Sequence, residues 1–199
     1  MLTLHQQKLS VMKSVMLHFA VGLVALLFLS SKEVAAQKWT LSTNAVDYVY
    51  LGTLNLEGSA ALSQHLSIHL GVRYNPWTFN NAKTQFQDRQ QTYKAGIRYW
   101  LWNTYSGLWF YGGGLYREYN RGGLIGPETE EGDAFGAGLS AGYSLMINKH
   151  FNLDFGLGLW GGMTSYTLYS CPQCGRVLDS GTKFFCTYDN LLISLAWIF

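Results

Sequence analysis

Bulky apolar side chains alternate with small or polar ones, residue by residue, through nearly all of the chain after residue 36. In the segment 66–74, for example, Leu, Ile, Leu, Val and Tyr occupy one face, and Ser, His, Gly and Arg occupy the other. A period of two residues is typical of β-strands, and helical spacing is absent. The chain is therefore expected to be all-β.

The make-up of the two faces distinguishes between the β folds. In a soluble sandwich or barrel, large apolar side chains point inward and the outside is charged. Here one face of each predicted strand is bulky and apolar almost without charge, whereas the other carries glycine, serine and a few charges, too small and polar for a core. An apolar exterior around a polar interior is the pattern of a closed barrel in lipid. We therefore predict an eight-stranded antiparallel up-and-down transmembrane β-barrel.

The connections between the predicted strands alternate in length. The strands are predicted at 38–50, 54–62, 66–74, 91–102, 108–118, 133–147, 151–166 and 186–199. The short connections are 63–65, 103–107 and 148–150, and the long ones are 75–90, 119–132 and 167–185. Outer-membrane barrels have short periplasmic turns and long outside loops. The long loops are therefore expected outside the cell, and only the loop 51–53 departs from the alternation.

Aromatic residues gather near both ends of the predicted strands. Two such girdles are expected at the headgroup levels of a spanning barrel. The predicted outer girdle contains Tyr48, Tyr50, Tyr74, Trp77, Tyr93, Tyr116, Tyr166 and Tyr188. The predicted inner girdle contains Trp39, Trp102, Trp109, Phe151 and Trp197.

The last strand ends in an apolar stripe that finishes at the C-terminal Phe199. This arrangement resembles the terminal signal by which outer-membrane proteins are recognised by their assembly machinery. We expect that machinery and outer-membrane lipid to be partners of the chain.

Residues 1–36 are predicted to be a signal peptide whose removal leaves a barrel over 37–199. Lys8 and Lys13 precede the apolar run 15–29, and the small residues 34–36 follow it. A basic head, a short apolar core and a small-residue cleavage site are typical of secretion. A retained membrane anchor is the alternative, but a run of about 15 residues is shorter than the roughly 20 that a spanning helix needs. The expected location is the outer membrane of a Gram-negative bacterium.

Five motifs, in order along the chain, resemble a known family. They are Trp39–Asn44, Tyr74–Phe79, Ile97–Trp100, Gly136–Tyr143 and Cys171–Gly175. Together they resemble the Bacteroides-type outer-membrane proteins of domain-of-unknown-function family 3575. The resemblance implies an outer-membrane barrel, sometimes encoded beside fimbrial or surface-adhesin genes, and it brings no catalytic residue.

Six charged or titratable residues are predicted to lie on the inner faces of the strands. They are Glu57, His69, Arg73, Lys94, Arg98 and Asp154. The interior of an eight-stranded barrel is just wide enough to be filled by side chains. Because charges are costly in lipid, they collect inside and neutralise one another. We expect a plug of paired charges, and a pore for small solutes is the alternative.

A lipid-modifying enzyme is the rival class of function. Such chemistry needs a nucleophile or an acid together with a base where substrate reaches them. Of the histidines after residue 36, His65 and His150 are predicted in periplasmic turns and His69 just inside the barrel. None reaches the predicted outer rim. No catalytic residue and no cofactor is therefore predicted, and the chain is not expected to be an enzyme.

The predicted outer loop 75–90 is the candidate binding surface, because recognition usually resides in loops held on a rigid scaffold. It combines aromatic and amide side chains, chiefly Trp77, Phe79, Asn80 and Asn81. Such a mixture suits a sugar or protein surface, and an unknown surface or fimbrial protein is the expected partner. Basic and acidic residues balance after residue 36, so nothing indicates a nucleic-acid partner.

Three cysteines, Cys171, Cys174 and Cys186, lie in or beside the predicted loop between the last two strands. A metal site would need four ligands, and no histidine is predicted on that side, so no metal is expected. Beyond the inner membrane, cysteines tend to be oxidised. The pairing is either Cys171 with Cys174, or one of these with Cys186. The family resemblance favours the first pairing, because Cys186 is an addition to the family pattern.

Overall fold

The computed structural model describes residues 38–80, 85–123, 126–171 and 175–199, which belong to one compact unit. The predicted signal peptide lies outside the described residues. The strands are β1 (Trp39–Asn44), β2 (Leu54–Ala61), β3 (Leu66–Asn75), β4 (Thr78–Asn80), β5 (Gln85–Trp100), β6 (Gly107–Gly122), β7 (Thr129–Met146), β8 (Phe151–Tyr169) and β9 (Val177–Ile198). A short helix, α2 (Ala45–Val49), follows β1.

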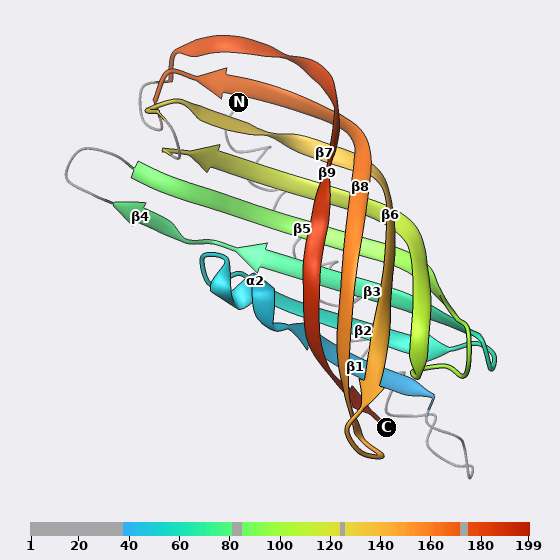
Figure 1. Ribbon diagram of the computed structural model, residues 1–199. Coiled ribbons are helices and arrows are strands. Elements are labelled where there is room, and N and C mark those ends of the chain that lie inside the picture. The colour runs from blue at the N-terminus through green and yellow to red at the C-terminus, as the bar shows by residue number, and fades with distance from the viewer. Residues whose placement is uncertain (1–37, 81–84, 124–125, 172–174) are drawn as a thin grey trace, which may run out of the picture. The chain divides into compact units, whose positions relative to one another are not determined.

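The strands form a closed antiparallel barrel (Figure 1). Each neighbouring pair is antiparallel, from β2 beside β1 round to β9, which pairs with β1 again. The small strand β4 extends the β3 side and pairs with the tip of β5, so eight strands make up the wall. The predicted eight-stranded antiparallel barrel is confirmed.

The two faces of the wall differ as the sequence predicts, and β3 shows this most clearly. Its burial alternates at every residue. Tyr74 on the outer face is 50% exposed, whereas Ser67 on the inner face is fully buried. Most large apolar side chains of the other strands are likewise exposed, apart from a buried group that includes Trp100, Trp109 and Ile198, so the barrel has an apolar exterior and a largely polar interior.

The first predicted strand, 38–50, is wrong in its second half. The strand ends at Asn44, whose side-chain Oδ1 accepts a hydrogen bond from the backbone N–H of Val46 and begins α2. An asparagine at this position favours a helix start. The apolar residues at 46, 48 and 50 nevertheless keep a spacing of two, which is why the sequence pattern suggested a longer strand.

The predicted long loops are largely strand. The pairings of β5 with β6, of β7 with β8 and of β8 with β9 continue well beyond the apolar zone, and β7 and β8 pair from Met146 and Asn152 out to Thr129 and Tyr169. In these extensions both faces are mostly polar, so the regular alternation that marks a strand in lipid is missing. Much of each long outer connection of the prediction is therefore strand, and these strand ends lie at the end of the barrel opposite the short turns. We call this the outer end, and the end with the short turns the inner end.

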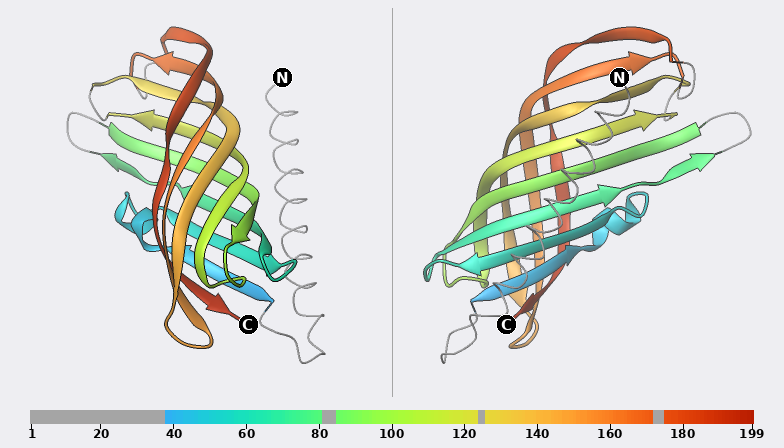
Figure 2. Two further views of the ribbon diagram at one scale, coloured as in Figure 1. Left: turned by 45° about the vertical axis from the view of Figure 1, so that its right-hand side comes forward. Right: turned by 180° about the vertical axis from the view of Figure 1, so that it is seen from behind.

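The strands β6 to β9 bend sharply midway along their length (Figures 1 and 2). Paired glycines occupy this region, including Gly136 opposite Gly162. A Cβ atom at Gly162 would lie 2.0 Å from the carbonyl oxygen of Phe135, so only glycine permits this close approach of β7 and β8.

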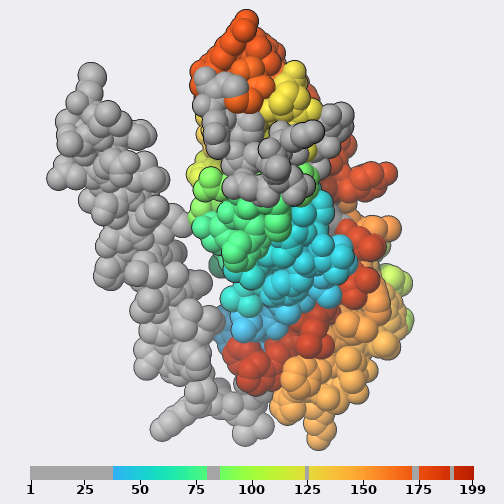
Figure 3. Space-filling view, turned by 90° about the vertical axis from the view of Figure 1, so that its left-hand side faces the viewer, coloured from blue at the N-terminus to red at the C-terminus, as the bar shows by residue number. Residues whose placement is uncertain are grey.

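The barrel closes along a short seam between β1 and β9. Five residue pairs join the two strands, from Thr40 with Ile198 to Asn44 with Ser194, and Trp39 exchanges two backbone hydrogen bonds with Phe199 just beyond them. The Asn44 side chain makes two further hydrogen bonds to the backbone of β9. Its Oδ1 accepts from the N–H of Ile193 at 3.0 Å, and its Nδ2 donates to the carbonyl of Leu191 at 3.4 Å. In Figure 3, the blue and cyan surface of the first strands borders the red surface of the last strand.

Candidate functional site

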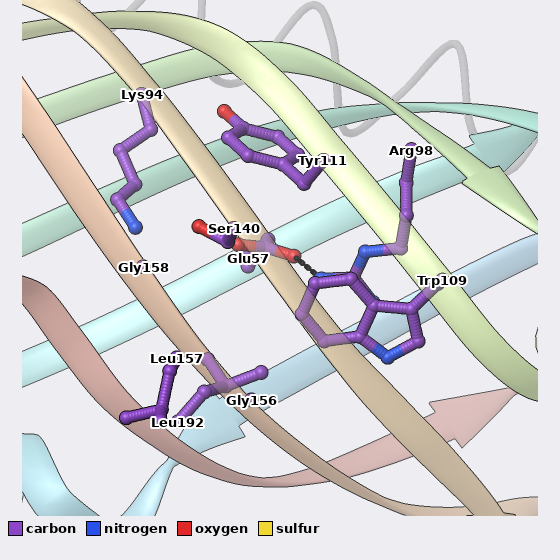
Figure 4. Close-up of a pocket in the computed structure, with 10 residues that line it drawn as sticks. All are labelled: Glu57, Lys94, Arg98, Trp109, Tyr111, Ser140, Gly156, Leu157, Gly158 and Leu192. Atoms are coloured by element: carbon purple, nitrogen blue, oxygen red, sulfur yellow. Dashed lines mark hydrogen bonds and ion pairs between the residues drawn. The ribbon is translucent and has the colours of Figure 1, made fainter.

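The inner half of the lumen is organised around Arg98 on β5. Its Nη1 donates to Asp154 on β8 at 3.0 Å, and its Nη2 donates to Glu57 on β2 at 3.3 Å. The guanidinium carbon lies 4.1 Å from the ring centroid of Trp109 on β6, as Figure 4 shows. One cation on β5 therefore joins two carboxylates and an aromatic ring from three other strands. We call Glu57, His69, Arg98 and Asp154 the Arg98 cluster.

His69 extends the Arg98 cluster toward the inner end. Its Nδ1 donates to Glu57 Oε1 at 2.8 Å, which leaves Nε2 to accept from the hydroxyl of Ser67, also at 2.8 Å. The indole of Trp100 donates to the same hydroxyl at 2.8 Å. The order hydroxyl, imidazole, carboxylate is that of a hydrolytic triad. However, Ser67 is fully buried and His69 is 3% exposed, so no substrate reaches the hydroxyl in this structure.

Asp154 is held from the other side by a second set of hydrogen bonds. The hydroxyl of Ser144 donates to its Oδ1 at 2.5 Å, and the Asn152 amide donates to the carbonyl of Tyr105. Tyr105 belongs to the turn between β5 and β6, where its φ of 68° directs the chain back toward the barrel. Its ring meets Trp100 edge to face at 5.7 Å, and these two aromatic rings close the inner end of the lumen.

Little space remains beside the Arg98 cluster. The cavity there has a volume of about 20 Å³ and is bordered by Glu57, Lys94, Arg98, Trp109 and Tyr111, among others. A volume of that size accommodates roughly one water molecule. In the inner half, the side chains of the wall therefore fill the lumen.

The outer half of the lumen, in contrast, holds a cavity of about 550 Å³. We call it the outer cavity. It is lined by Val46, Asp47, Tyr50, Arg73, Asp88, Gln90, Arg117, Tyr119, Arg121, Glu130, Ala134, Trp160, Thr164, Lys183, Phe185, Thr187 and Tyr188.

Three ion pairs cross the outer cavity or its rim. Arg73 Nε lies 3.0 Å from Asp47 Oδ2, and both side chains are buried. Arg121 Nε donates to Asp88 at 3.2 Å, and the same carboxylate accepts from the hydroxyl of Tyr50 at 2.6 Å.

The third pair, Lys183 with Glu130 at 2.8 Å, lies at the outer rim, where both side chains are partly exposed. Partial burial acts to raise the pKa of Glu130, but its hydrogen bonds with Lys183 and Tyr119 outweigh this and lower it. The carboxylate therefore stays ionised to a lower pH than an ordinary glutamate.

The predicted lumen residues all lie inside the barrel, but they form two groups. Glu57, His69, Arg98 and Asp154 form the cluster described above. Arg73 belongs to the outer half with Asp47, and Lys94 borders the small cavity between the two groups.

The predicted loop residues lie at the outer end. The Trp77 indole donates to the carbonyl of Gly52 at 2.9 Å. Phe79 lies in β4 with its ring 6.1 Å from that of Phe86. Asn80 ends β4, and Asn81 lies outside the described residues.

The cysteines have different states. Cys171 is disulfide-bonded, whereas Cys186 is a free, exposed thiol on the outer face of β9. Cys174 lies outside the described residues. Within the part of the chain that the structure describes, no group of three or more His, Cys, Asp or Glu side chains is arranged to hold a metal ion.

Several site residues were not expected from the sequence. Asp47 was assigned to a strand and Asp88 to a loop, so neither was expected in the lumen. Trp109 was predicted in the inner girdle but is 1% exposed inside the barrel. In 108–111 all four residues are bulky and apolar or aromatic, so this segment alone does not reveal its inner face. The sequence around the turn residue Tyr105 did not indicate that its side chain enters the lumen.

A family model described as "Protein of unknown function (DUF3575)" matches residues 22–199. No curated protein and no solved structure matches the chain. Among the described residues, no helix is long and apolar enough to cross a membrane.

Proposed function

Because the chain belongs to the DUF3575 family, whose description assigns no function, we propose from its own geometry that it is a small outer-membrane barrel with a plugged lumen. In this proposal it serves as a structural, anchoring or interaction protein, for instance in surface or fimbrial assembly, and it acts through its outer end. Residues 1–36 are then the signal peptide that directs the chain to the outer membrane.

The apolar exterior supports the membrane location. Apolar and aromatic side chains are exposed around the barrel, among them Leu70 on β3, Phe110 on β6, Leu139 on β7 and Leu157 on β8. An exposed apolar surface of this extent is unfavourable in water and suits lipid. We expect the protein to fractionate with the outer membrane and to migrate faster unboiled than boiled in detergent gels. A compact monomer that stays soluble without detergent would overturn the membrane location.

The Arg98 cluster is the observation that best supports a plugged lumen. Buried charges that neutralise one another occupy the inner half, and the residual cavity holds about one water molecule. A conducting path would require these groups to separate. In planar bilayers, pure protein is therefore expected to give no stable conductance, and long-lived open channels would refute the plug.

The length of the strands supports a role at the outer end. A spanning strand needs about 9–11 residues, whereas β7, β8 and β9 contain 18, 19 and 22. Their surplus residues extend the paired strands beyond the apolar zone, with mostly polar side chains on both faces. Such projections form a rigid platform for a partner. Crosslinking in intact outer membranes, from photoreactive residues placed at Thr182 and at the inner-end Asn148, should capture a partner from the first position only.

One specific observation favours a second candidate, a hydrolase. Ser67, His69 and Glu57 have the order and spacing of a triad, and complete burial of the hydroxyl argues against it. A fluorophosphonate probe should therefore leave Ser67 unlabelled in the folded barrel. Labelling that is abolished in Ser67→Ala would establish the enzyme instead.

A further inference from the structure

The wall of the barrel is incomplete beside the outer half of β9. Along its length β9 pairs with β8, but its pairing with β1 begins only at Ser194. Farther out, β1 has already given way to α2, which lies against β9 without adding a strand to the sheet. Apart from the contacts of Asn44, the described residues place no strand on this edge of β9.

The outer cavity extends to this edge. Trp160 and Thr187 are paired across β8 and β9 and face the lumen, whereas the paired Leu159 and Tyr188 face outward. Tyr188 is 80% exposed on the outer face and still lines the cavity. A cavity lined from both faces of β9 opens through the wall at its edge, between β9 and α2. The opening lies at the level of the apolar exterior, because Phe184, two pairs farther out than Cys186, is 82% exposed.

The lining of the outer cavity combines an apolar part and a cationic part. Phe185 packs on Trp160 with ring centroids 4.4 Å apart, next to Ala134. The Arg117 guanidinium lies 5.4 Å from the Trp160 ring centroid, and its Nε donates to Thr92. Four basic residues (Arg73, Arg117, Arg121 and Lys183) and three acidic ones (Asp47, Asp88 and Glu130) line the cavity, which is thus positive by one charge.

The outer cavity is also large enough to hold a small molecule. The volume of about 550 Å³ lies within the range of roughly 300–1,000 Å³ that is usual for small-molecule sites.

We propose that the outer cavity binds an anionic amphiphile. Its headgroup oxygens lie near Arg117, and its apolar chain leaves between β9 and α2 into the surrounding lipid. This inference rests on the proposed membrane location. The shared chemistry is an acidic headgroup on an acyl chain, which a fatty acid or a phospholipid with a single chain supplies.

The test is native mass spectrometry of the whole mature barrel released from a nonionic detergent, with three probes: oleate, oleoyl lysophosphatidylglycerol and neutral oleyl alcohol. We expect one oleate or one lysophospholipid per barrel, bound about tenfold or more tightly than the alcohol, as loss of a charge-assisted hydrogen bond predicts. Oleate binding alone assigns the site to fatty acids, and lysophospholipid binding alone to phospholipids. Equal binding of the alcohol overturns the anionic assignment.

Two matched variants on β9 locate the site. Thr187→Trp fills the cavity, and Thr182→Trp places the same side chain on the outer face, away from the cavity lining. The first should weaken oleate binding about tenfold, and the second should leave it unchanged. Arg117→Gln serves the same purpose if Trp at position 187 prevents folding. Equal binding by all variants, or adducts that do not saturate, identifies lipid bound to the outside only and overturns the proposal. Membrane fractionation and bilayer recordings do not depend on this ligand. A failure of the proposed function is therefore distinguishable from a failure of the ligand proposal.

Discussion

Replacing Arg98 by methionine tests the Arg98 cluster most directly. The change keeps a long side chain but removes the cation between Asp154 and Glu57, whose contacts with it are 3.0 and 3.3 Å. Both carboxylates then keep only neutral hydrogen-bond donors, the His69 imidazole for Glu57 and the Ser144 hydroxyl for Asp154, but Asp154 is the more buried of the two. The main cost is therefore an uncompensated carboxylate at Asp154, whose side chain is 7% exposed.

The size of the effect follows from that burial. Removing one partner of a buried ion pair costs about 3–5 kcal/mol of unfolding free energy, and two unit charges 4 Å apart at an effective dielectric constant of 20 interact with about 4 kcal/mol. We expect Arg98→Met to lower the free energy of unfolding by about 3–5 kcal/mol. Arg98→Glu should be worse, because it adds a third acidic group beside the other two.

The assay is urea unfolding of the barrel in detergent micelles, followed by tryptophan fluorescence and by the gel shift between folded and unfolded forms. Arg89→Met is the matched control: Arg89 lies on the same strand but is exposed, so its loss should change stability by less than about 0.5 kcal/mol. Combining Arg98→Met with Asp154→Asn should recover more than half of the loss, because the more buried carboxylate is then removed and Glu57 keeps the hydrogen bond from His69. A loss below about 1 kcal/mol, or no recovery in the double variant, would show that Arg98 does not neutralise the lumen.

Three further predictions concern the ends and the outer rim. Deleting Phe199 should lower the fraction of assembled barrel in cells. The variant Phe199→Ala removes only the aromatic ring and retains the two backbone hydrogen bonds to Trp39. Equal assembly of the wild type and both variants would show that the aromatic terminus carries no assembly signal. Thiol titration of the denatured, unreduced protein should find one free thiol per chain, from Cys186, and three would disprove the disulfide. Glu130→Gln should destabilise the barrel by less than about 1 kcal/mol at neutral pH, because the pair with Lys183 is partly exposed. Since the pKa of Glu130 is lowered, its contribution is complete above the ordinary carboxyl pKa of about 4.3 and is lost as the pH falls through the lower folded value; a difference between variant and wild type that stays constant with pH would contradict this sign.

The fold was predictable from the sequence wherever the wall separates two environments. In 66–74, lipid-type and lumen-type side chains alternate without exception, and the structure places them on the expected faces. Beyond the apolar zone both faces of the wall contact water, so the alternation of apolar and polar side chains disappears. For this reason strand segments such as the outer part of β7 were predicted to be loops. The two-residue spacing also continues through Val46 and Tyr48 into α2, so the first strand was predicted to be longer than it is.

The composition of the lumen was predictable, but its pairing was not. Which charges face inward follows from parity along each strand. Which of them meet depends on the relative shift of strands distant in sequence, such as β5 and β8, and on turns that fold back inward. The contact of Arg98 with Asp154 and the insertion of Tyr105 therefore could not be inferred from the sequence pattern.

The short seam has a consequence for the order of folding. β1 is the first strand of the barrel and β9 the last, and the Asn44 contact with Ile193 joins residues 149 positions apart. Pairings of such high contact order form slowly, because the loop that they close is long. Until β9 arrives, the free edge of β1 is a template for wrong strand pairing and aggregation. A first strand of only six residues presents few unpaired backbone groups during that delay, so the brevity of β1 protects the unfinished barrel.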